Sequence, residues 1–246
     1  MIFDENYSNW KDWNHSNFGK TSLQDIKYFD AQINPLIKSL HNSRKRHDVR
    51  VLELGFGNGN FLNYCKTNNL SVTGVELNES LLKIAKSEKF DVIDFESFKK
   101  NNDNFDLIVA FDVLEHVPPN ELEQLFVKLS NCLNKEGCIF FRFPNGDSPF
   151  GLVNQNGDIT HVSSIGSFKI SHLADVASLD VERVCPPAQP LIAGNYLITL
   201  HRLIFGPVKM FLNFLIKIIM FPDKKIYFFS TNLTATLRKK TKQNNR

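Results

Sequence analysis

Three glycines spaced two residues apart lie in residues 51–62, where they separate an apolar run from a segment of helical character. In this stretch, VLELGFGNGNFL, the glycines are Gly55, Gly57 and Gly59. A strand-to-helix turn of this kind offers backbone N–H groups and a helix N-terminus to a nucleotide. The dinucleotide pattern needs its third glycine at position 60, which is Asn60 here. Glu53 precedes the turn, and a carboxylate there is unsuited to a pyrophosphate but suited to a cationic ligand.

Predicted strands and helices, which must position this turn, alternate along the chain. Short apolar runs predict strands at VRVLELG, SVTGVELN, FDVIDF, FDLIVAFDV, CIFFRFPN and DVERVC, and a last long strand at KIYFFSTNLTATLRK. Helical patterns lie between most of them. We therefore predict an α/β fold with a doubly wound, mostly parallel sheet of seven strands, in which ligands bind at the carboxyl ends of the strands.

Two helix boundaries are predicted from local signals. Pro118 and Pro119, followed by Asn120 and Glu123 in a capping-box arrangement, predict a helix start, and Gly137 is placed to end that helix. Near the N-terminus, the sequence predicts a helix from Ser22 to about Ile33 and a second one from Pro35 to about His41.

Four motifs in this order resemble those of the class I S-adenosylmethionine-dependent methyltransferases. VLELGFGNG resembles their first motif, VTGVELN the second, DVIDF the third and FDLIVAFDVLEHV the fourth. The resemblance covers residues 50–145, extends weakly to FFSTNLTATLRK and implies a Rossmann-like methyltransferase fold. It also implies that S-adenosylmethionine is the cofactor and S-adenosylhomocysteine the product. Glu76 is then expected to bind the ribose diol, and Asp94 and Phe95 the adenine.

The resemblance implies a set of cofactor-binding residues around the carboxyl ends of the strands. They are Glu53, Gly55, Phe56, Gly57, Gly59, Asn60, Glu76, Leu77, Asp94, Phe95, Phe111 and Asp112. The N-terminal segment adds Trp13, which with Trp10 and Phe18 forms either a lid over the cofactor or simple packing on the domain edge. Leu114-Glu115-His116 follows the fourth motif, and we expect His116 to shape the entry to the next helix.

The acceptor side is predicted from the loop GDSPFGLVNQNGDITHVSSIG, whose length of about twenty residues suggests a functional loop. Methyl transfer to a hydroxyl needs a base within hydrogen-bond reach of the acceptor. In the resembling family this region borders the acceptor pocket, so His161 is the candidate catalytic base. Asp158 either orients His161 or acts in its place. The alternative is that the two residues only fix the loop. His172, between apolar helical residues, is expected to be structural.

The cysteines are scattered, at Cys65, Cys132, Cys138 and Cys185, without a Cys-x-x-Cys pair or a zinc spacing. We therefore expect no metal site. The N-terminus has no secretory pattern, so a reducing cytoplasmic location is expected.

Charge and composition divide the chain. Residues 1–190 carry 19 Lys/Arg and 25 Asp/Glu, whereas residues 191–246 carry 10 Lys/Arg and one acid. The predicted organisation is an N-terminal helical arm or lid (1–49), a cofactor-binding domain (50–190 and 224–238), an apolar, basic helical insertion (191–223) and a basic tail (239–246). A basic C-terminal part suggests an anionic neighbour.

The insertion before the last strand is apolar but is interrupted by Arg202, Lys209 and Lys217, and it holds no uncharged run of about 18 residues. It is therefore a poor transmembrane span. Lys209, Asn213 and Lys217 form one polar stripe, typical of a helix in a membrane interface or packed against protein. We expect it to contact a membrane surface or a lipid-linked acceptor at the inner face of the membrane. The alternatives are a lid or a homodimer surface.

The expected function is O-methylation of a sugar or glycan intermediate of the bacterial O-antigen or capsule type. This acceptor rests on analogy with methyltransferases of similar arrangement. A quinone, a lipid or another small molecule is the alternative acceptor. A cofactor-fold protein without catalysis is the alternative of another class, and the intact Glu53, Glu76 and Asp94 argue against it. Nucleic acid is not an expected partner, because the basic residues accompany an apolar helix rather than interleaved aromatics.

Overall fold

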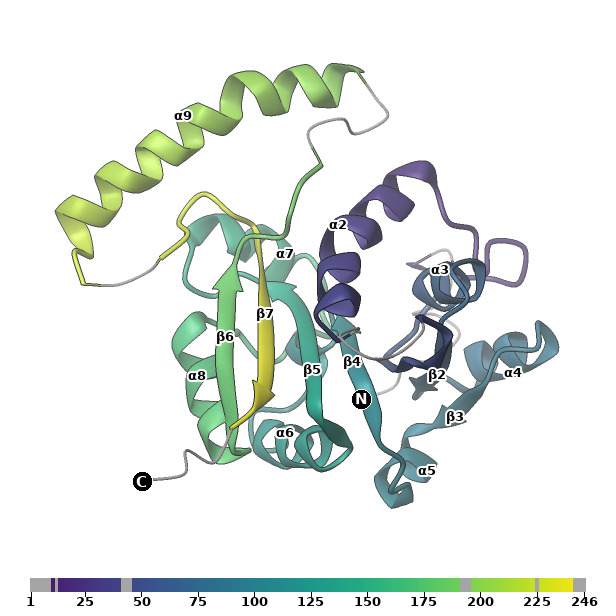
Figure 1. The fold of residues 1–246 in the computed structure, drawn as a ribbon. Helices are drawn as coiled ribbons and strands as arrows, with labels where there is room; N and C mark the ends of the chain where they lie inside the picture. Colours follow the sequence, from purple (N-terminus) through teal and green to yellow (C-terminus); the bar gives the residue numbers. More distant parts are fainter. Residues whose placement is uncertain (1–9, 12, 41–45, 191–195, 224–225, 241–246) are drawn as a thin grey trace.

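The computed structural model describes residues 10–11, 13–40, 46–190, 196–223 and 226–240. Within them, seven strands form one sheet in the order β3-β2-β1-β4-β5-β7-β6 (Figure 1). The strands are β1 (Arg50–Leu54), β2 (Ser71–Glu76), β3 (Val92–Asp94), β4 (Phe105–Phe111), β5 (Leu133–Pro144), β6 (Leu179–Cys185) and β7 (Asn232–Lys239). Only β7 runs antiparallel to its neighbours. The predicted fold class is confirmed.

Helices cover both faces of the sheet. They are α2 (Leu23–Leu40), α3 (Asn60–Thr67), α4 (Glu79–Ser87), α5 (Phe95–Lys100), α6 (Leu122–Asn131), α7 (Leu152–Asn156), α8 (Ser167–Val176) and α9 (Tyr196–Met220), with 3-10 turns η1 (Arg46–Asp48), η2 (Leu114–His116) and η3 (Pro149–Gly151). Alternation along β4 divides the core: Leu107 and Val109 pack with α2 and α3, while Ile108 and Ala110 pack with α5, α6 and α8.

The parallel strands end along one edge of the sheet. Glu76 at the end of β2 is in register with Asp94 at the end of β3, and Leu54 of β1 lies between Val75 of β2 and Ala110 of β4. The chain therefore leaves every parallel strand on this side. This edge brings together the glycine turn, η2 and the loop after β5.

The helix predicted after Pro119 is shorter than expected. α6 ends at Asn131, and residues 133–137 belong to β5. The helix begins at Leu122 with Glu121, rather than the predicted Asn120, at the N-cap position, and no side chain caps it. Leu133 pairs with Phe105 through an irregularity in β4. A side chain at Gly137 would meet the carbonyl oxygen of Asp106 at 2.9 Å. The glycine therefore permits close strand approach, and it does not end a helix.

Other boundaries also differ from the prediction. α2 is continuous through Pro35, because Phe29, Ile33 and Ile37 form one buried face across it. The loop after β5 contains η3 and α7, and α5 follows β3 directly. β7 begins only at Asn232.

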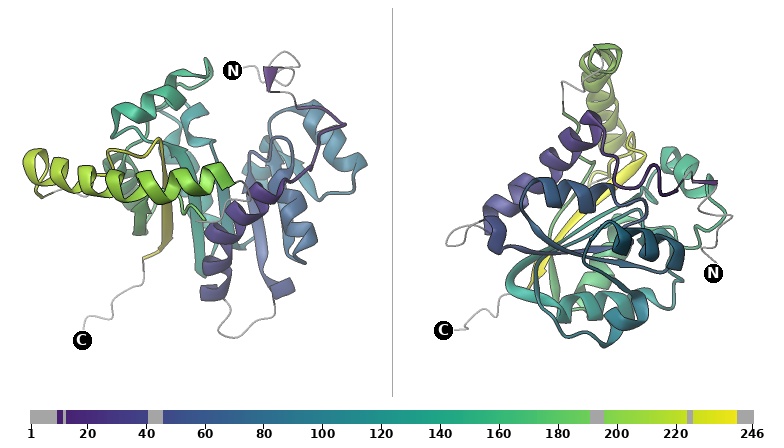
Figure 2. Two further views of the ribbon diagram at one scale, coloured as in Figure 1. Left: turned by 90° about the horizontal axis from the view of Figure 1, so that it is seen from above. Right: turned by 90° about the vertical axis from the view of Figure 1, so that its right-hand side faces the viewer.

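Helix α9 stands off from the domain beyond the ends of β6 and β7 (Figures 1 and 2). Its described residues include none that is buried. Among the described residues it is the one helix whose length and apolar composition would suffice to cross a bilayer, although the sequence marked it as a poor span. Asn213 joins it to the returning chain, accepting a hydrogen bond from the Phe228 amide at 2.7 Å.

Candidate active site

A cavity of about 610 Å³ opens at the carboxyl edge of the sheet. Glu53 and the glycine turn form one wall, Asp112, Glu115 and His116 a second, and Asp158 and His161 a third. The structure thus brings the predicted acceptor residues to the first motif of the cofactor site.

The glycine turn adopts a backbone that favours glycine. Gly55, Gly57 and Gly59 have φ values of 68°, 50° and 71°. A side chain at Gly57 would approach the Trp13 ring to 3.1 Å, and one at Gly59 would lie 2.5 Å from the Phe18 ring. The N-terminal arm therefore packs directly on the turn, and Trp13 lines the cavity.

Glu53 is the buried acid at the base of the turn. Its Oε2 has no hydrogen-bond partner among the described residues. Burial, and then the nearby Glu76, raise the pKa of Glu53 well above its usual range. A cationic group in the cavity would supply the missing partner, so this wall fits the positively charged amino group of a methionine-type ligand.

Glu76 is held by backbone amides at the end of β2. Its Oε2 accepts from the Gly57 amide at 3.0 Å, and its Oε1 accepts from the Leu77 and Asn78 amides at 2.7 and 3.1 Å. Burial raises the pKa of Glu76, while these hydrogen bonds act to lower it. The carboxylate is therefore fixed in one position beside the turn.

Five of the predicted cofactor-binding residues, including those expected at the ribose and adenine, lie along the same edge but outside the cavity wall. They are Gly59, Glu76, Leu77, Asp94 and Phe95. Asp94 caps α5, accepting from the Ser97 amide at 2.8 Å and the Ser97 hydroxyl at 2.7 Å, and these bonds lower the pKa of Asp94. By contrast, the other predicted cofactor residues, Trp13, Glu53, Gly55, Phe56, Gly57, Asn60, Phe111 and Asp112, all line the cavity.

An arginine missed by sequence reasoning, Arg142, lines the cavity beside Asp112. Arg142 of β5 donates from Nε to Asp112 Oδ1 at 2.8 Å, and its guanidinium lies 5.2 Å from the Tyr28 ring. Burial acts to lower the pKa of Arg142, but Asp112 outweighs this and raises it. The signal available in the sequence was a charged residue within the apolar run CIFFRFPN.

The Asp158 carboxylate accepts hydrogen bonds from neighbouring donors and pairs with a lysine. It forms an ion pair with Lys11 at 2.8 Å and accepts from the Thr160 hydroxyl at 2.6 Å and the Thr160 amide at 2.9 Å. Burial acts to raise the pKa of Asp158, but the bonds from Lys11 and Thr160 outweigh it and hold that pKa well below its usual range. A carboxylate so stabilised is a poor proton acceptor.

His161 is better placed to accept a proton. Its Nδ1 lies 3.1 Å from the Gln155 carbonyl oxygen, which assigns the proton to Nδ1 and the lone pair to Nε2. Nε2 lies 3.8 Å from Asp158 Oδ2 and 4.0 Å from Glu115 Oε1. The ring therefore turns its basic nitrogen toward two carboxylates.

Glu115 and His116 join this group although the sequence suggested only a helix entry there. Glu115 is fully buried, and burial followed by the charge of Asp112 raises its pKa well above the usual range. His116 lines the cavity, with its ring centroid 4.6 Å from that of His161. Burial, and then His161, lower the pKa of His116 to about 4. His172 lies elsewhere, exposed beside Glu123.

Comparisons with known proteins identify the family and the fold of this chain. A family model described as a methyltransferase domain matches residues 25–182. The ubiquinone biosynthesis O-methyltransferase of Coxiella burnetii is 26% identical over 172 residues, which cover 67% of this chain and 64%, less than two thirds, of that protein. The cyclopropane-fatty-acyl-phospholipid synthase of Escherichia coli is 34% identical over 93 residues, which cover 36% of this chain and 24% of that protein. A solved methyltransferase structure from Archaeoglobus fulgidus shares the fold, with 21% identity, a TM-score of 0.60 and coverage of 87% of this chain and 94% of that chain.

Proposed function

Because this chain belongs to the methyltransferase-domain family and uses S-adenosylmethionine as its cofactor, we propose that it methylates a hydroxyl group of a sugar or glycan intermediate. The observation that carries the proposal is the position of His161 in the same cavity as Glu53 and the glycine turn. Charged side chains from all walls line this cavity, which suits a polyhydroxyl acceptor better than an apolar one.

The chain's own residues divide the chemical tasks. The cofactor supplies an electrophilic methyl group on a sulfonium. Glu53 and the turn hold the cofactor's amino-acid end, with Trp13 covering Gly57. His161 Nε2 accepts the proton of the acceptor hydroxyl, and Glu115 stabilises the imidazolium formed. Asp158, paired with Lys11, anchors the loop that carries His161.

A quinone precursor is the second candidate acceptor. The similarity to the Coxiella O-methyltransferase favours it, because the matched segment covers most of this chain. Assays with a hydroxylated quinone precursor and with a lipid-linked sugar would discriminate between these acceptors. Transfer to the quinone alone would overturn the glycan proposal.

Cofactor identity gives a direct prediction. We expect calorimetric titration with S-adenosylmethionine to show one site per chain, and titration with NAD to show none, because Glu53 faces the turn where a pyrophosphate would need donors. Tight NAD binding would contradict the proposed function. The absence of methyl transfer to any acceptor, despite binding, would favour the non-catalytic alternative.

We further propose that α9 places the enzyme on the cytoplasmic face of a membrane. Phe211 and Met210 are 60% and 76% exposed, and Arg202, Lys209 and Lys217 lie on the same helix. An exposed apolar helix with cationic residues binds anionic interfaces by apolar burial and by salt-sensitive attraction. This position would present a lipid-linked acceptor close to the carboxyl edge.

Membrane contact predicts a clear sedimentation result. Wild-type protein should co-sediment with anionic vesicles, less so at higher salt, and Phe211→Asp should weaken binding several-fold. Phe168→Asp is the matched control, because Phe168 on α8 is 61% exposed. Equal binding by both variants would remove α9 from the interaction. Failure of the wild type to bind would favour a lid or a homodimer surface.

A further inference from the structure

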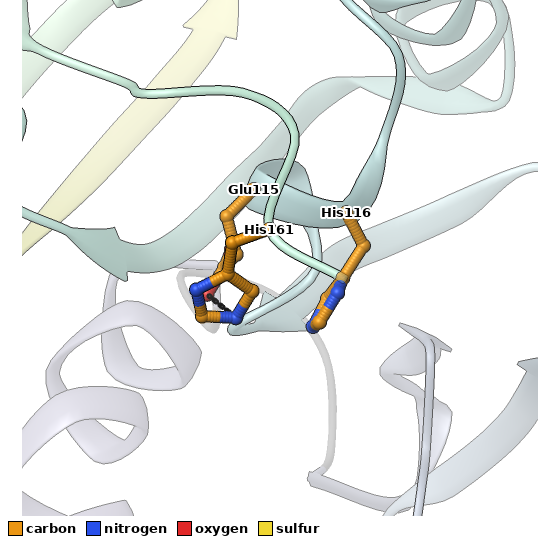
Figure 3. A group of neighbouring side chains, drawn as sticks. All are labelled: Glu115, His116 and His161. Carbon is orange, nitrogen blue, oxygen red and sulfur yellow. Dashed lines mark ion pairs between the residues drawn. The ribbon is translucent and has the colours of Figure 1, made fainter. Parts of the chain in front are cut away.

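Glu115, His116 and His161 lie close together (Figure 3), and all three line the cavity. One ligand atom from each lies within 4.8 Å of the other two. Two of these residues come from η2, and the third comes from the loop that follows α7. The group therefore forms only when that loop folds back over the end of β4.

Glu115 is the member of the group whose buried carboxylate lacks hydrogen bonds. Its side chain is 1% exposed, yet neither carboxylate oxygen has a hydrogen-bond partner among the described residues. The separation of 4.0 Å from His161 Nε2 is too long for a hydrogen bond. A buried carboxylate without partners is strongly unfavourable unless a proton or a cation compensates it.

Both imidazoles are oriented for ligation. His116 Nδ1 lies 2.9 Å from the Thr160 hydroxyl, and that hydroxyl donates onward to Asp158. His161 Nδ1 lies 3.1 Å from the Gln155 carbonyl oxygen. Each ring thus donates from Nδ1 and directs the lone pair of Nε2 away from that partner. Hydrogen bonds of this kind fix the tautomer and orientation of metal-binding histidines.

We propose that Glu115, His116 and His161 bind one divalent transition-metal ion in the wall of the active-site cavity. Two imidazoles and one carboxylate on one side of an ion are a donor set for Zn²⁺, Fe²⁺ and similar ions, and they leave further coordination positions open. Ligand bonds of about 2.0–2.2 Å require the donor atoms to close to roughly 3 Å from one another. The donor atoms lie within 4.8 Å of one another, so side-chain rotations would have to accompany binding of the ion.

The ion deepens the proposed function, on which this inference rests. Because Glu115, His116 and His161 all line the cavity, an ion held by them would be accessible to two neighbouring oxygens of a sugar diol. Coordination would lower the pKa of the bound hydroxyl, so that its proton could pass to water. The oxygen electron pair would then form the bond to the methyl carbon while the sulfur–methyl bond breaks and its electron pair stays on sulfur, leaving S-adenosylhomocysteine. His161 then serves as a ligand in place of a base, and the ion acidifies the acceptor.

Zinc titration of the full-length, tag-free, chelator-treated protein tests the site. We expect one Zn²⁺ per chain by calorimetry and a visible absorption spectrum of bound Co²⁺. Glu115→Gln and His161→Ala should each weaken Zn²⁺ binding about 100-fold, because each removes one of three protein ligands. His172→Ala should leave binding unchanged, since His172 with Glu123 is a histidine–carboxylate pair outside the cavity.

Two results would overturn the metal site. One is wild-type binding of Zn²⁺ no tighter than that of His161→Ala, and the other is equal weakening by His172→Ala. Circular dichroism verifies that each variant is folded. If Glu115→Gln does not fold, the comparison with the wild type is made with His161→Ala alone. S-adenosylmethionine affinity is measured on the same samples. If the protein binds S-adenosylmethionine but not the metal, only the metal site is contradicted. If it does not bind S-adenosylmethionine, the proposed function itself is contradicted.

Discussion

Exchange of His161 for Gln is expected to reduce methyl transfer by about 10²–10⁴-fold, the usual contribution of a positioned base. The amide of Gln keeps much of the volume and polarity of the ring but cannot accept the hydroxyl proton. The affinity for S-adenosylmethionine should stay within about twofold, because the polar contacts of His161 are with Gln155, Glu115 and Asp158, none of which belongs to the glycine turn. The reduction is also expected if His161 holds an ion, since the hydroxyl would again lose the group that acidifies it.

Single-turnover rates and calorimetric cofactor titrations separate the two effects. His172→Gln provides the control, because that histidine is exposed on α8 and pairs with Glu123 at 3.4 Å. Unchanged turnover in His161→Gln would remove His161 from the mechanism. Weak cofactor binding with unaltered chemistry would reassign it to the cofactor site.

Exchange of Gly57 for Ala is expected to weaken S-adenosylmethionine binding by at least about tenfold. The backbone at Gly57 has φ 50°, which costs a residue with a side chain about 1–2 kcal/mol. The new methyl group would stand 3.1 Å from the Trp13 ring, so either the ring or the turn must shift. A difference of 1.4 kcal/mol corresponds to about tenfold in affinity. The Gly57 amide that donates to Glu76 would move with the turn.

The measurement is a calorimetric titration with S-adenosylmethionine, accompanied by thermal unfolding. Gly206→Ala is the matched control, since a side chain at Gly206 in α9 meets nothing within 4 Å. Wild-type affinity in Gly57→Ala would show that the turn does not contact the cofactor. Equal loss in both variants would indicate a general effect on the fold.

Much of the cofactor half could be predicted because its signals are local. The alternation of apolar runs with helical segments is set by residues within a few positions of one another, and it predicted the sheet correctly. The three glycines of the turn have positive φ values, a conformation that glycine favours, and their spacing is visible in the sequence. Errors arose where packing outweighed local signals, as at Pro35 inside α2 and Gly137 inside β5.

The acceptor side of the cavity depends on ion pairs and contacts between residues that are distant in the sequence, and no local pattern predicts them. Arg142 meets Asp112 from a position 30 residues away, and Lys11 reaches Asp158 from the N-terminal arm. Glu115 gained its place beside His161 only because the loop after β5 folds over η2, where Val162 and Ser163 donate backbone hydrogen bonds to the Glu115 carbonyl.

The sequence by itself determined the glycine turn, the acids at the strand ends and the resemblance to a methyltransferase, since short-range spacing decides each of these. The tertiary structure alone decided that Asp158 is neutralised by Lys11, that Arg142 pairs with Asp112 and that Glu115 is buried against two histidines. The physical reason is that charge pairing and burial depend on distance in space, and the sheet edge sets those distances by bringing together loops that are remote in the chain.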